Sequence, residues 1–322
     1  LSFTLREPLG VVGAITPWNA PLPITMLKVA PALATGCTLV LKPAELTPLT
    51  AMRLVELCQE AGVPDGVINL VFVDGPTAGE VIFNHPDFAG IHFTGSTGVF
   101  NRMWETIGKN MGMYKTYPRI VGETGGKDFV IAHKSADVDT VVTALARGAF
   151  EYQGQKCSAA SRAYIPSNIA AQVKKKLVDE IKTMKMGTVE DFTNFVNAVI
   201  DEKSFDKLES YIKQARKRNS GAKIWVGGGC DKSQGYFIEP TIIEATDPRY
   251  VTMCEELFGP VLTVYIYDEN KYEETLKLVD STSGYALTGA VLATDRQAIE
   301  TAVHKLRNAA GNFYINDKPT GA

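Results

Sequence analysis

The stretch Val11-Val12-Gly13-Ala14-Ile15-Thr16-Pro17-Trp18-Asn19 decides the fold, because a short apolar run passes directly into a polar turn. The apolar run predicts a buried strand, and the amphipathic segment at residues 22–33 predicts a helix. The same order of strand, turn and helix recurs along the chain. Buried strands that alternate with helices are typical of a doubly wound parallel sheet with right-handed crossovers. The predicted fold class is therefore α/β.

Further apolar runs predict the remaining strands of two domains. In the first half these strands cover residues 38–41, 69–73, 90–93 and 120–121, with helices at 48–61, after Gly75-Pro76 and after Ser96. In the second half they cover residues 129–131, 163–165, 224–226, 261–267 and 289–292. We place the junction at Gly125-Gly126, because two glycines permit a backbone path that other residues resist. The sequence thus predicts two mainly parallel-sheet domains, residues 1–124 and 125–315, with a cleft between them.

Composition excludes several classes of function. The 322 residues are 45% hydrophobic and 21% charged, with a net charge of −3, which is ordinary for a globular enzyme with a large core. This charge gives no electrostatic reason to expect nucleic acid or an anionic membrane as a partner. No apolar run is long enough to span a bilayer. The five cysteines are scattered without zinc spacing, so we expect no metal and a reducing compartment.

Polar groups gather where the strands of the first half end, although no GxGxxG fingerprint follows any strand. They form four loops, at residues 16–19, 42–45, 75–79 and 94–96. Ligands of open parallel sheets bind beyond the carboxyl ends of strands, where all four loops fall. Lys42 and Glu45 could hold ribose hydroxyls, and Gly95 with Ser96 could hold a pyrophosphate at a helix start. Each loop alone fits a cap or a turn equally well, but four in register favour a nucleotide.

Two residues are candidates for covalent chemistry. Cys157 lies among small residues beside Lys156, a setting that favours an accessible thiolate, although a lone cysteine also fits a buried apolar position. Glu123 ends a strand and could act as a general base, or equally as a cap or hinge contact. Structural roles are favoured for all four histidines, which disfavours hydrolases in which histidine activates the thiol. These histidines are His85, His92, His133 and His304.

Six strings, in this order, resemble the aldehyde dehydrogenase superfamily over essentially the whole chain. They are Thr16-Pro17-Trp18-Asn19, Leu41-Lys42-Pro43-Ala44-Glu45, Phe93-Thr94-Gly95-Ser96-Thr97, Glu123-Thr124-Gly125-Gly126-Lys127, Gly154-Gln155-Lys156-Cys157 and Glu255-Glu256-Leu257-Phe258-Gly259-Pro260. From Ile68 onward the chain resembles a narrower branch, the 1-pyrroline-5-carboxylate (glutamate γ-semialdehyde) dehydrogenases. The strings that carry this are 117–123, 150–159 and 307–318. The first stretch is more similar to the superfamily in general.

The resemblance implies a role for each matching residue. Cys157 is implied as the nucleophile, Glu123 as the base that activates the hydrolytic water, and Asn19 with the Cys157 amide as the oxyanion hole. Ser158 is implied as a contact to the substrate carboxylate. The implied NAD-binding residues are Ile15, Thr16, Pro17, Trp18, Lys42, Glu45, Gly75, Phe93, Gly95, Ser96, Glu256 and Phe258. The Glu45 carboxylate would repel a 2′-phosphate, so NAD is favoured over NADP.

The resemblance also implies a function and an organisation. Residues 1–124 would bind NAD, residues 125–315 would carry the nucleophile, and residues 316–322 would begin a return to the first domain. The implied activity is NAD-dependent oxidation of glutamate γ-semialdehyde to glutamate in proline catabolism. We expect a truncation at both ends relative to the family, so two alternatives are a silent fragment that retains NAD affinity and a broad-specificity aldehyde dehydrogenase. The full-length form is expected to be a homo-oligomer in a bacterial cytoplasm or a mitochondrial matrix.

Overall fold

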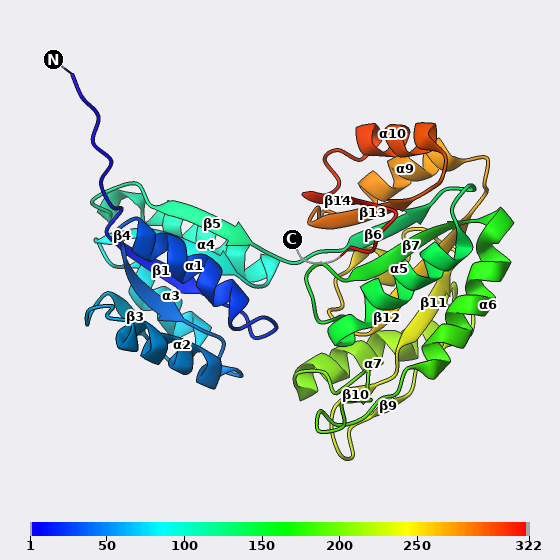
Figure 1. The fold of residues 1–322 in the computed structure, drawn as a ribbon, viewed down its shortest axis with the longest axis horizontal. Coiled ribbons are helices and arrows are strands. Elements are labelled where there is room, and N and C mark those ends of the chain that lie inside the picture. The colour runs from blue at the N-terminus through cyan, green and yellow to red at the C-terminus, as the bar shows by residue number, and fades with distance from the viewer. Residues whose placement is uncertain (1, 320–322) are drawn as a thin grey trace. The chain divides into compact units, whose positions relative to one another are not determined.

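The computed structural model describes residues 2–319. The chain divides into two compact units, Leu1–Thr124 and Gly125–Ala322, each built around its own parallel sheet (Figure 1). The predicted return segment at 316–322 lies partly outside the described residues, since 320–322 are not among them. The α/β class predicted from the sequence is confirmed, with sheets that are mainly parallel in both units.

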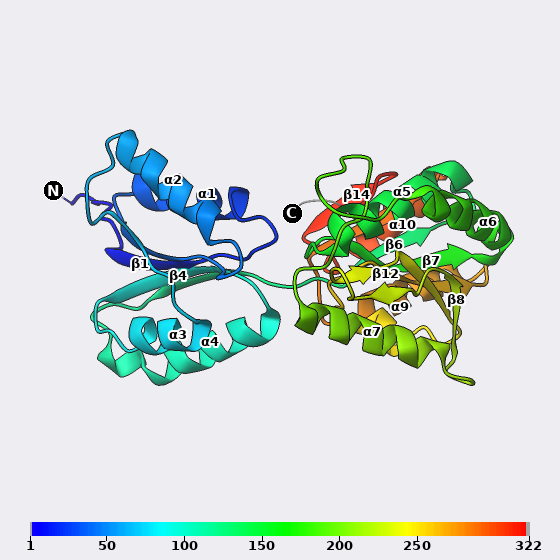
Figure 2. The same cartoon turned by 90° about the horizontal axis from the view of Figure 1, so that it is seen from below.

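The first unit is a five-stranded sheet in the order β3-β2-β1-β4-β5, with every neighbouring pair parallel. Its strands are β1 (Val11–Ile15), β2 (Thr38–Lys42), β3 (Ile68–Leu70), β4 (Phe88–Thr94) and β5 (Arg119–Glu123). Its helices are α1 (Pro23–Ala34), α2 (Pro48–Glu60), α3 (Gly75–Phe83), α4 (Thr97–Lys109) and the short 3₁₀ helix η1 (Met111–Met113). Helices α1 and α2 cover one face of the sheet and α3 and α4 the other (Figure 2). This two-sided cover explains the continuous apolar runs of β1, β2 and β4.

Strand β3 is shorter than the strand predicted at 69–73. The chain leaves the sheet after Leu70 because Asp74 caps the next helix, α3. The Asp74 carboxylate accepts a hydrogen bond of 2.9 Å from the backbone N–H of Thr77. An N-cap residue has non-helical backbone angles and orients the chain for the first turn, so the segment before it becomes a loop.

The second unit is a seven-stranded sheet in the order β14-β13-β6-β7-β12-β11-β8, with a separate β9–β10 hairpin. Its strands are β6 (Asp128–Ala132), β7 (Ala160–Pro166), β8 (Ala222–Val226), β9 (Cys230–Asp231), β10 (Phe237–Ile238), β11 (Thr241–Ala245), β12 (Val261–Tyr267), β13 (Thr288–Leu292) and β14 (Asn312–Ile315). Its helices are α5 (Val138–Phe150), η2 (Glu151–Gly154), α6 (Ser167–Thr183), α7 (Glu202–Arg216), α8 (Val251–Cys254), α9 (Tyr272–Ser281) and α10 (Arg296–Lys305). Only β8 at one edge pairs antiparallel within the larger sheet.

Hydrophobic clusters lie on both faces of this sheet, and α7 forms a further one with β11 and β12. Helices α5 and α6 pack on one face, where Val130, Leu145 and Leu177 are fully buried. Helices α9 and α10 pack on the other face, around Phe129 and Leu276. Every residue of the interior strand β6 is buried, as expected of a parallel strand that is covered on both sides.

The glycines at the start of the second unit serve a different purpose from the one that the sequence suggested. Neither Gly125 nor Gly126 adopts the left-handed φ range that favours glycine. Glycine is needed at both positions because neighbouring atoms approach the backbone closely. A Cβ on Gly125 would collide with the Glu256 carboxylate, and one on Gly126 would collide with the Cys157 carbonyl oxygen. Close packing, rather than an unusual backbone path, is therefore what excludes a side chain here.

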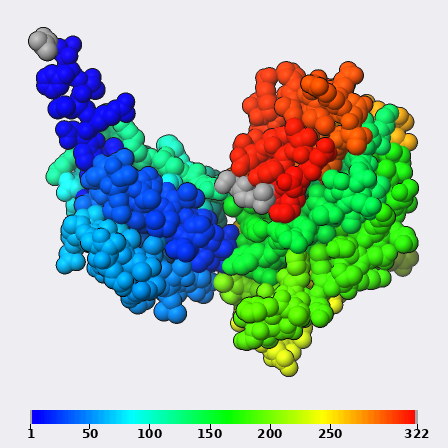
Figure 3. All heavy atoms as spheres, in the orientation of Figure 1, coloured from blue at the N-terminus to red at the C-terminus, as the bar shows by residue number. Residues whose placement is uncertain are grey.

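The segment before β1 extends from the body of the first unit, as the space-filling view shows (Figure 3). Its apolar side chains are exposed, with Phe3 at 80% and Leu5 at 70%. Within the described part of the chain, no helix is both long enough and apolar enough to cross a membrane.

Candidate active site

The polar loops of the first unit meet at one edge of its sheet. Ile15, Lys42 and Thr94 end their strands, and the parallel register pairs Ile15 with Lys42 and Thr94 with Glu123. The residues that follow, including the segment from Thr16 to Asn19, therefore lie at the carboxyl edge. The side chain of Thr16 is buried, and its hydroxyl is held at 3.1 Å by the hydroxyl of Thr25 on α1. The structure thus brings the predicted nucleotide loops together, at the place where open parallel sheets bind ligands.

Lys42 and Glu45 form an ion pair at this edge. The Lys42 Nζ lies 2.7 Å from Glu45 Oε1, and the side chains are 6% and 54% exposed respectively. Burial would raise the pKa of Glu45, but the hydrogen bond and charge of Lys42 outweigh it and lower the pKa. Glu45 therefore presents an ionised carboxylate to solvent beside a fixed ammonium. That pair offers an acceptor and a donor to two neighbouring hydroxyls.

Helix α4 begins at this edge without a side-chain cap. Ser96 is the N-cap residue with extended backbone angles, and its exposed hydroxyl makes no capping hydrogen bond. The Gly95 N–H donates to the Glu123 carbonyl at 3.2 Å, and a Cβ on Gly95 would lie 2.6 Å from the Phe93 ring. Uncapped amides at a helix N-terminus attract anions, and the Ser96 hydroxyl adds a donor.

The aromatic and glycine members of the predicted set have different surroundings. Phe93 is 3% exposed and its ring stacks on Phe100 at 5.5 Å, so this side chain belongs to the core of the first unit. Gly75 is exposed at the start of α3, and Pro17 and Trp18 are half-buried. Phe93 thus shapes the site through packing beneath Gly95, while the loop residues are accessible.

Lys28 is a residue of this edge that the sequence did not single out. It lies within α1 yet is only 3% exposed, and its Nζ donates a hydrogen bond of 2.7 Å to the Thr94 hydroxyl. Burial lowers the pKa of Lys28 to about 8, and the negative charge of Glu123 partly opposes that shift. A lysine in an amphipathic helix usually extends into water. The only sequence signal was that Lys28 falls on the apolar face of α1 with Val29 and Ala32.

In the second unit, Cys157 follows a strained turn. Tyr152, Gln153 and Gly154 have φ values of 55°, 56° and 63°, so three successive residues are left-handed. A non-glycine residue in this region costs of the order of 1–3 kcal/mol, and such strain is common at functional sites. A Cβ on Gly154 would collide with the Gly259 carbonyl. The half-buried Cys157 comes three residues later, between η2 and the amino end of β7.

An ion network supports this turn. Glu151 accepts hydrogen bonds from Arg147 at 2.7 Å, Lys156 at 3.1 Å and Lys318 at 3.1 Å. Burial would raise the pKa of Glu151, but these three hydrogen bonds outweigh it and lower the pKa to about 2. The Lys156 ammonium, which the sequence suggested as an activator of the thiol, is therefore paired with Glu151.

The predicted nicotinamide residues border the Cys157 loop. Glu256 and Phe258 line a cavity of about 10 Å³ together with Gly126, Gly154 and Lys156. The Gly126 N–H donates to Glu256 Oε1 at 2.9 Å, and burial raises the pKa of Glu256 against that hydrogen bond.

Two further predicted residues of the second unit have definite surroundings. Ser158 is 4% exposed, and its carbonyl accepts a hydrogen bond of 3.4 Å from the Thr288 hydroxyl. Phe258 has a φ of 61°, so a further non-glycine residue with a left-handed backbone lines this cavity. The cofactor and substrate roles of these residues stay predictions.

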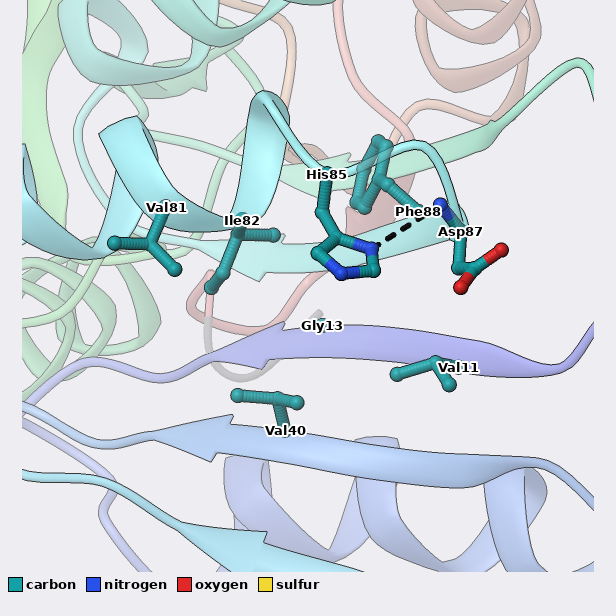
Figure 4. Close-up of a pocket in the computed structure, with 8 residues that line it drawn as sticks. All are labelled: Val11, Gly13, Val40, Val81, Ile82, His85, Asp87 and Phe88. Atoms are coloured by element: carbon teal, nitrogen blue, oxygen red, sulfur yellow. Dashed lines mark hydrogen bonds between the residues drawn. The ribbon is translucent and has the colours of Figure 1, made fainter. Parts of the chain in front are cut away.

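An apolar cavity of the first unit, shown in Figure 4, is lined by residues outside the predicted loops. It has a volume of about 280 Å³ and lies over the amino halves of β1 and β2, beneath α3. Val11 and Phe88, the first residues of their strands, line it, as does His85, whose Nδ1 accepts from the Asp87 N–H at 3.1 Å. This cavity is thus at the opposite edge of the sheet from Lys42 and Ser96.

The histidines have the surroundings that the sequence predicted. His92 lies in β4, His133 directly follows β6 and His304 lies in α10. Burial lowers the pKa of His92 to about 4, with a further lowering by the charge of Lys28. No group of three histidine, cysteine or acidic side chains among residues 2–319 is arranged to hold a metal ion.

Known proteins are similar to this chain over nearly its whole length. A 1-pyrroline-5-carboxylate dehydrogenase of Dictyostelium discoideum, described as mitochondrial, is 54% identical over 98% of this chain and 57% of its own length. The human protein of that name is 46% identical, over 97% of this chain and 55% of its own. The chain thus spans little more than half the length of these relatives.

The backbone of this chain is likewise similar to those of solved structures. The Mycobacterium tuberculosis 1-pyrroline-5-carboxylate dehydrogenase bound with NAD has a TM-score of 0.89 at 46% identity, covering 98% of this chain and 58% of that one. A Staphylococcus aureus betaine aldehyde dehydrogenase in complex with NAD also has a TM-score of 0.89, at 36% identity, over 98% and 61%. The aldehyde dehydrogenase family matches residues 1–322 in full. These matches establish that the chain belongs to the aldehyde dehydrogenase family.

Proposed function

We propose that this chain carries the NAD-binding and nucleophile-bearing parts of an enzyme that oxidises L-glutamate γ-semialdehyde, the open form of 1-pyrroline-5-carboxylate, to glutamate. The observation that carries the proposal is Cys157, a half-buried residue that follows three left-handed residues, in a loop whose Gly154 and Lys156 line a cavity with Glu256 and Phe258. Strain of this kind is retained where it positions a reacting group. The substrate class follows from the name and the 54% identity of the Dictyostelium relative.

NAD fits the residues at the carboxyl edge of the first sheet, where Lys42 and Glu45 would hold the adenosine ribose, and the Ser96 hydroxyl and uncapped α4 amides the pyrophosphate. In the second unit, Glu256 would hold the nicotinamide ribose. The exposed Glu45 carboxylate would repel a 2′-phosphate, which favours NAD over NADP. Bound NAD accepts the hydride that leaves the substrate carbon.

The chain's own residues supply the remaining chemistry. The Cys157 thiolate adds to the aldehyde carbon, and Asn19 with the Cys157 N–H stabilises the resulting oxyanion. Loss of hydride leaves a thioester on Cys157. Glu123 then removes a proton from the water that attacks this thioester, and glutamate and the free thiol are released. Ser158 is proposed to contact the substrate's α-carboxylate.

Lys28 supports the base in this scheme. Its ammonium attracts the Glu123 carboxylate and is anchored on the Thr94 hydroxyl at 2.7 Å. We propose that this attraction positions the Glu123 carboxylate for the proton transfer.

The setting of the reaction follows the relatives. Because the Dictyostelium relative is named mitochondrial, we propose the mitochondrial matrix in a eukaryote or the cytoplasm in a bacterium. The full-length protein is proposed to be a homo-oligomer, and its substrate a small aldehyde.

An assay of NADH formation with two aldehydes tests the proposal. Absorbance would be followed with glutamate γ-semialdehyde and, separately, with an aliphatic aldehyde of similar length that lacks the carboxylate. Oxidation of the semialdehyde alone supports the proposed substrate. Equal rates favour a broad-specificity enzyme, for which the shared TM-score of 0.89 with the betaine aldehyde dehydrogenase is the supporting observation. NAD binding without turnover would identify a silent fragment and overturn the proposed activity of this chain.

A further inference from the structure

A buried polar cluster behind Cys157 has no part in the proposed mechanism. It comprises Lys127 and Asp128 at the amino end of β6 and Arg162 on the neighbouring strand β7. Each of the three is 1% exposed. Buried charges are costly unless they are paired or hydrogen-bonded, so the partners of each group show what the cluster does.

Arg162 is occupied by neutral acceptors. Its Nε donates to the Lys127 carbonyl at 2.7 Å, and its Nη1 donates to the Tyr164 hydroxyl at 3.1 Å and the Val279 carbonyl at 2.9 Å. None of the ion pairs within residues 2–319 joins it to Asp128. Asp128 is therefore not neutralised by direct contact with the guanidinium.

The Asp128 carboxyl group has one satisfied and one unsatisfied oxygen. Oδ1 accepts a hydrogen bond of 2.6 Å from the Thr288 N–H on β13. Oδ2 is buried and has no hydrogen-bond partner. A buried carboxylate oxygen without a donor is unfavourable, and a proton on that oxygen removes the unpaired charge.

Oδ2 faces the backbone of the nucleophile. A Cβ placed on Gly126 would collide with both Asp128 Oδ2 and the Cys157 carbonyl oxygen, each less than 3.0 Å from it. The two oxygens therefore converge on one point above Gly126. Two unprotonated acceptors in this position would repel each other, whereas a proton on Oδ2 turns the pair into a donor and an acceptor.

We propose that Asp128 is a positioning residue for the nucleophile. Its protonated Oδ2 donates a hydrogen bond to the Cys157 carbonyl oxygen and holds the loop that contains Cys157 (the nucleophile loop) against β6. The link ties the residue that carries the thiol to a strand of the second unit in which every residue is buried. The positioning role rests on the proposed function, because it concerns the residue proposed to attack the aldehyde.

The protonation of Asp128 makes this link depend on pH. Burial raises the pKa of Asp128 to about 7, against the hydrogen bonds from Thr288 and the positive charge of Arg162, while Glu256 adds to the rise. Lys127 also faces the cluster, and burial lowers its pKa to about 7, with Cys254 of α8 and Glu256 opposing. Below pH 7 the donor is present, and above it Oδ2 becomes an acceptor that repels the carbonyl. The nucleophile loop should accordingly loosen as the pH rises through that value.

Hydrogen exchange measured by mass spectrometry tests the link directly. Protection factors of the peptide at residues 155–162, corrected for the intrinsic effect of pH, would be compared below and above pH 7 in the 322-residue chain. Asp128→Asn is the matched variant, because its amide oxygen accepts from Thr288 while its NH₂ donates to Cys157 at every pH. Asp128→Ala removes the donor.

The three chains have distinct expected results. The parent should lose protection in this peptide above pH 7, the Asn variant should keep it at both pH values, and the Ala variant should lack it at both. Loss of one net hydrogen bond predicts a decrease of roughly 3- to 10-fold. If the Ala variant does not fold, comparison of the parent with the Asn variant is sufficient to test the link.

Two outcomes would overturn the proposal. One is the same pH response in the parent and in the Asn variant, and the other is full protection of the peptide in the Ala variant. Exchange does not depend on turnover, so a chain that fails to oxidise any aldehyde still gives a readable result. An NADH assay on the same preparations separates failure of the proposed function from failure of the link.

Discussion

Replacing Lys28 by Met tests whether a charged lysine is truly held in the interior of the first unit. The methionine keeps an unbranched stem of similar length and removes both the ammonium and its hydrogen bond to Thr94. Two effects of opposite sign follow. The variant avoids the free-energy cost of burying a charged ammonium, which stabilises it. It also leaves the buried Thr94 hydroxyl without its donor, which destabilises it.

The two effects can be sized from the structure. The pKa of Lys28 is lowered from 10.5 to about 8. At about 1.4 kcal/mol per unit, the charged form in the folded unit costs roughly 3 kcal/mol. Loss of the hydrogen bond costs about 1–3 kcal/mol, so near pH 7 the variant should be equal to the parent or more stable by roughly 1–2 kcal/mol.

The dependence on pH separates these terms. Because the folded pKa lies below the unfolded one, the folded state binds fewer protons between pH 8 and 10.5. The destabilisation of the parent by the buried charge is therefore complete below pH 8 and decreases as the pH rises to 10.5. Any advantage of Lys28→Met should shrink by roughly 3 kcal/mol over that interval and end as a deficit.

Denaturant unfolding at several pH values measures this difference. Tryptophan fluorescence in a Trp225→Phe background would report on the first unit alone, since Trp18 and Trp104 both lie there. The background substitution is present in both chains and so cancels. A constant difference in the free energy of unfolding between the two chains across pH 8 to 10.5 would refute the buried charge at Lys28.

Three other substitutions have definite expected results. Glu45→Gln should weaken NAD binding and narrow the preference for NAD over NADP by roughly 10-fold, measured by fluorescence titration with each nucleotide, because repulsion of the 2′-phosphate is lost. Glu151→Gln should remove stability that the parent has above pH 4.5 and loses as the pH falls towards 2, measured by circular dichroism during acid titration. Gly126→Ala should destabilise the second unit by roughly 1–3 kcal/mol in thermal unfolding, because its Cβ meets the Cys157 carbonyl, whereas Gly108→Ala, where a Cβ meets nothing within 4 Å, is the control.

The parts of the fold that the sequence predicted are those with long apolar runs. The strands near Val11, Val261 and Gly289 were found because buried parallel strands are continuously apolar. Strand β11 was missed because only Ile242 and Ile243 form its apolar core, between polar residues. Strand β14 and the β9–β10 hairpin were missed as well, since two to four residues give no recognisable period.

The positions of the candidate site loops were predictable where they depend on local sequence motifs. The loops at Thr16, Lys42 and Ser96 were found because the ends of strands can be recognised in the sequence. Parallel strands bring those ends to one edge of the sheet. Lys28 was missed because its burial depends on Thr94, 66 residues away. The Asp128 contact was missed for the same reason, since no local pattern shows that the Cys157 carbonyl packs against Gly126.

The most direct test of the central claim is a search for the acyl enzyme on Cys157. The chain would be mixed with NAD and glutamate γ-semialdehyde, quenched in acid and digested. The mass of the peptide that contains Cys157 would then be measured by mass spectrometry. The account predicts an adduct equal to the substrate less two hydrogens on that cysteine, and none in Cys157→Ala. NADH formation by Cys157→Ala at the rate of the parent, or an adduct confined to another cysteine, would contradict it.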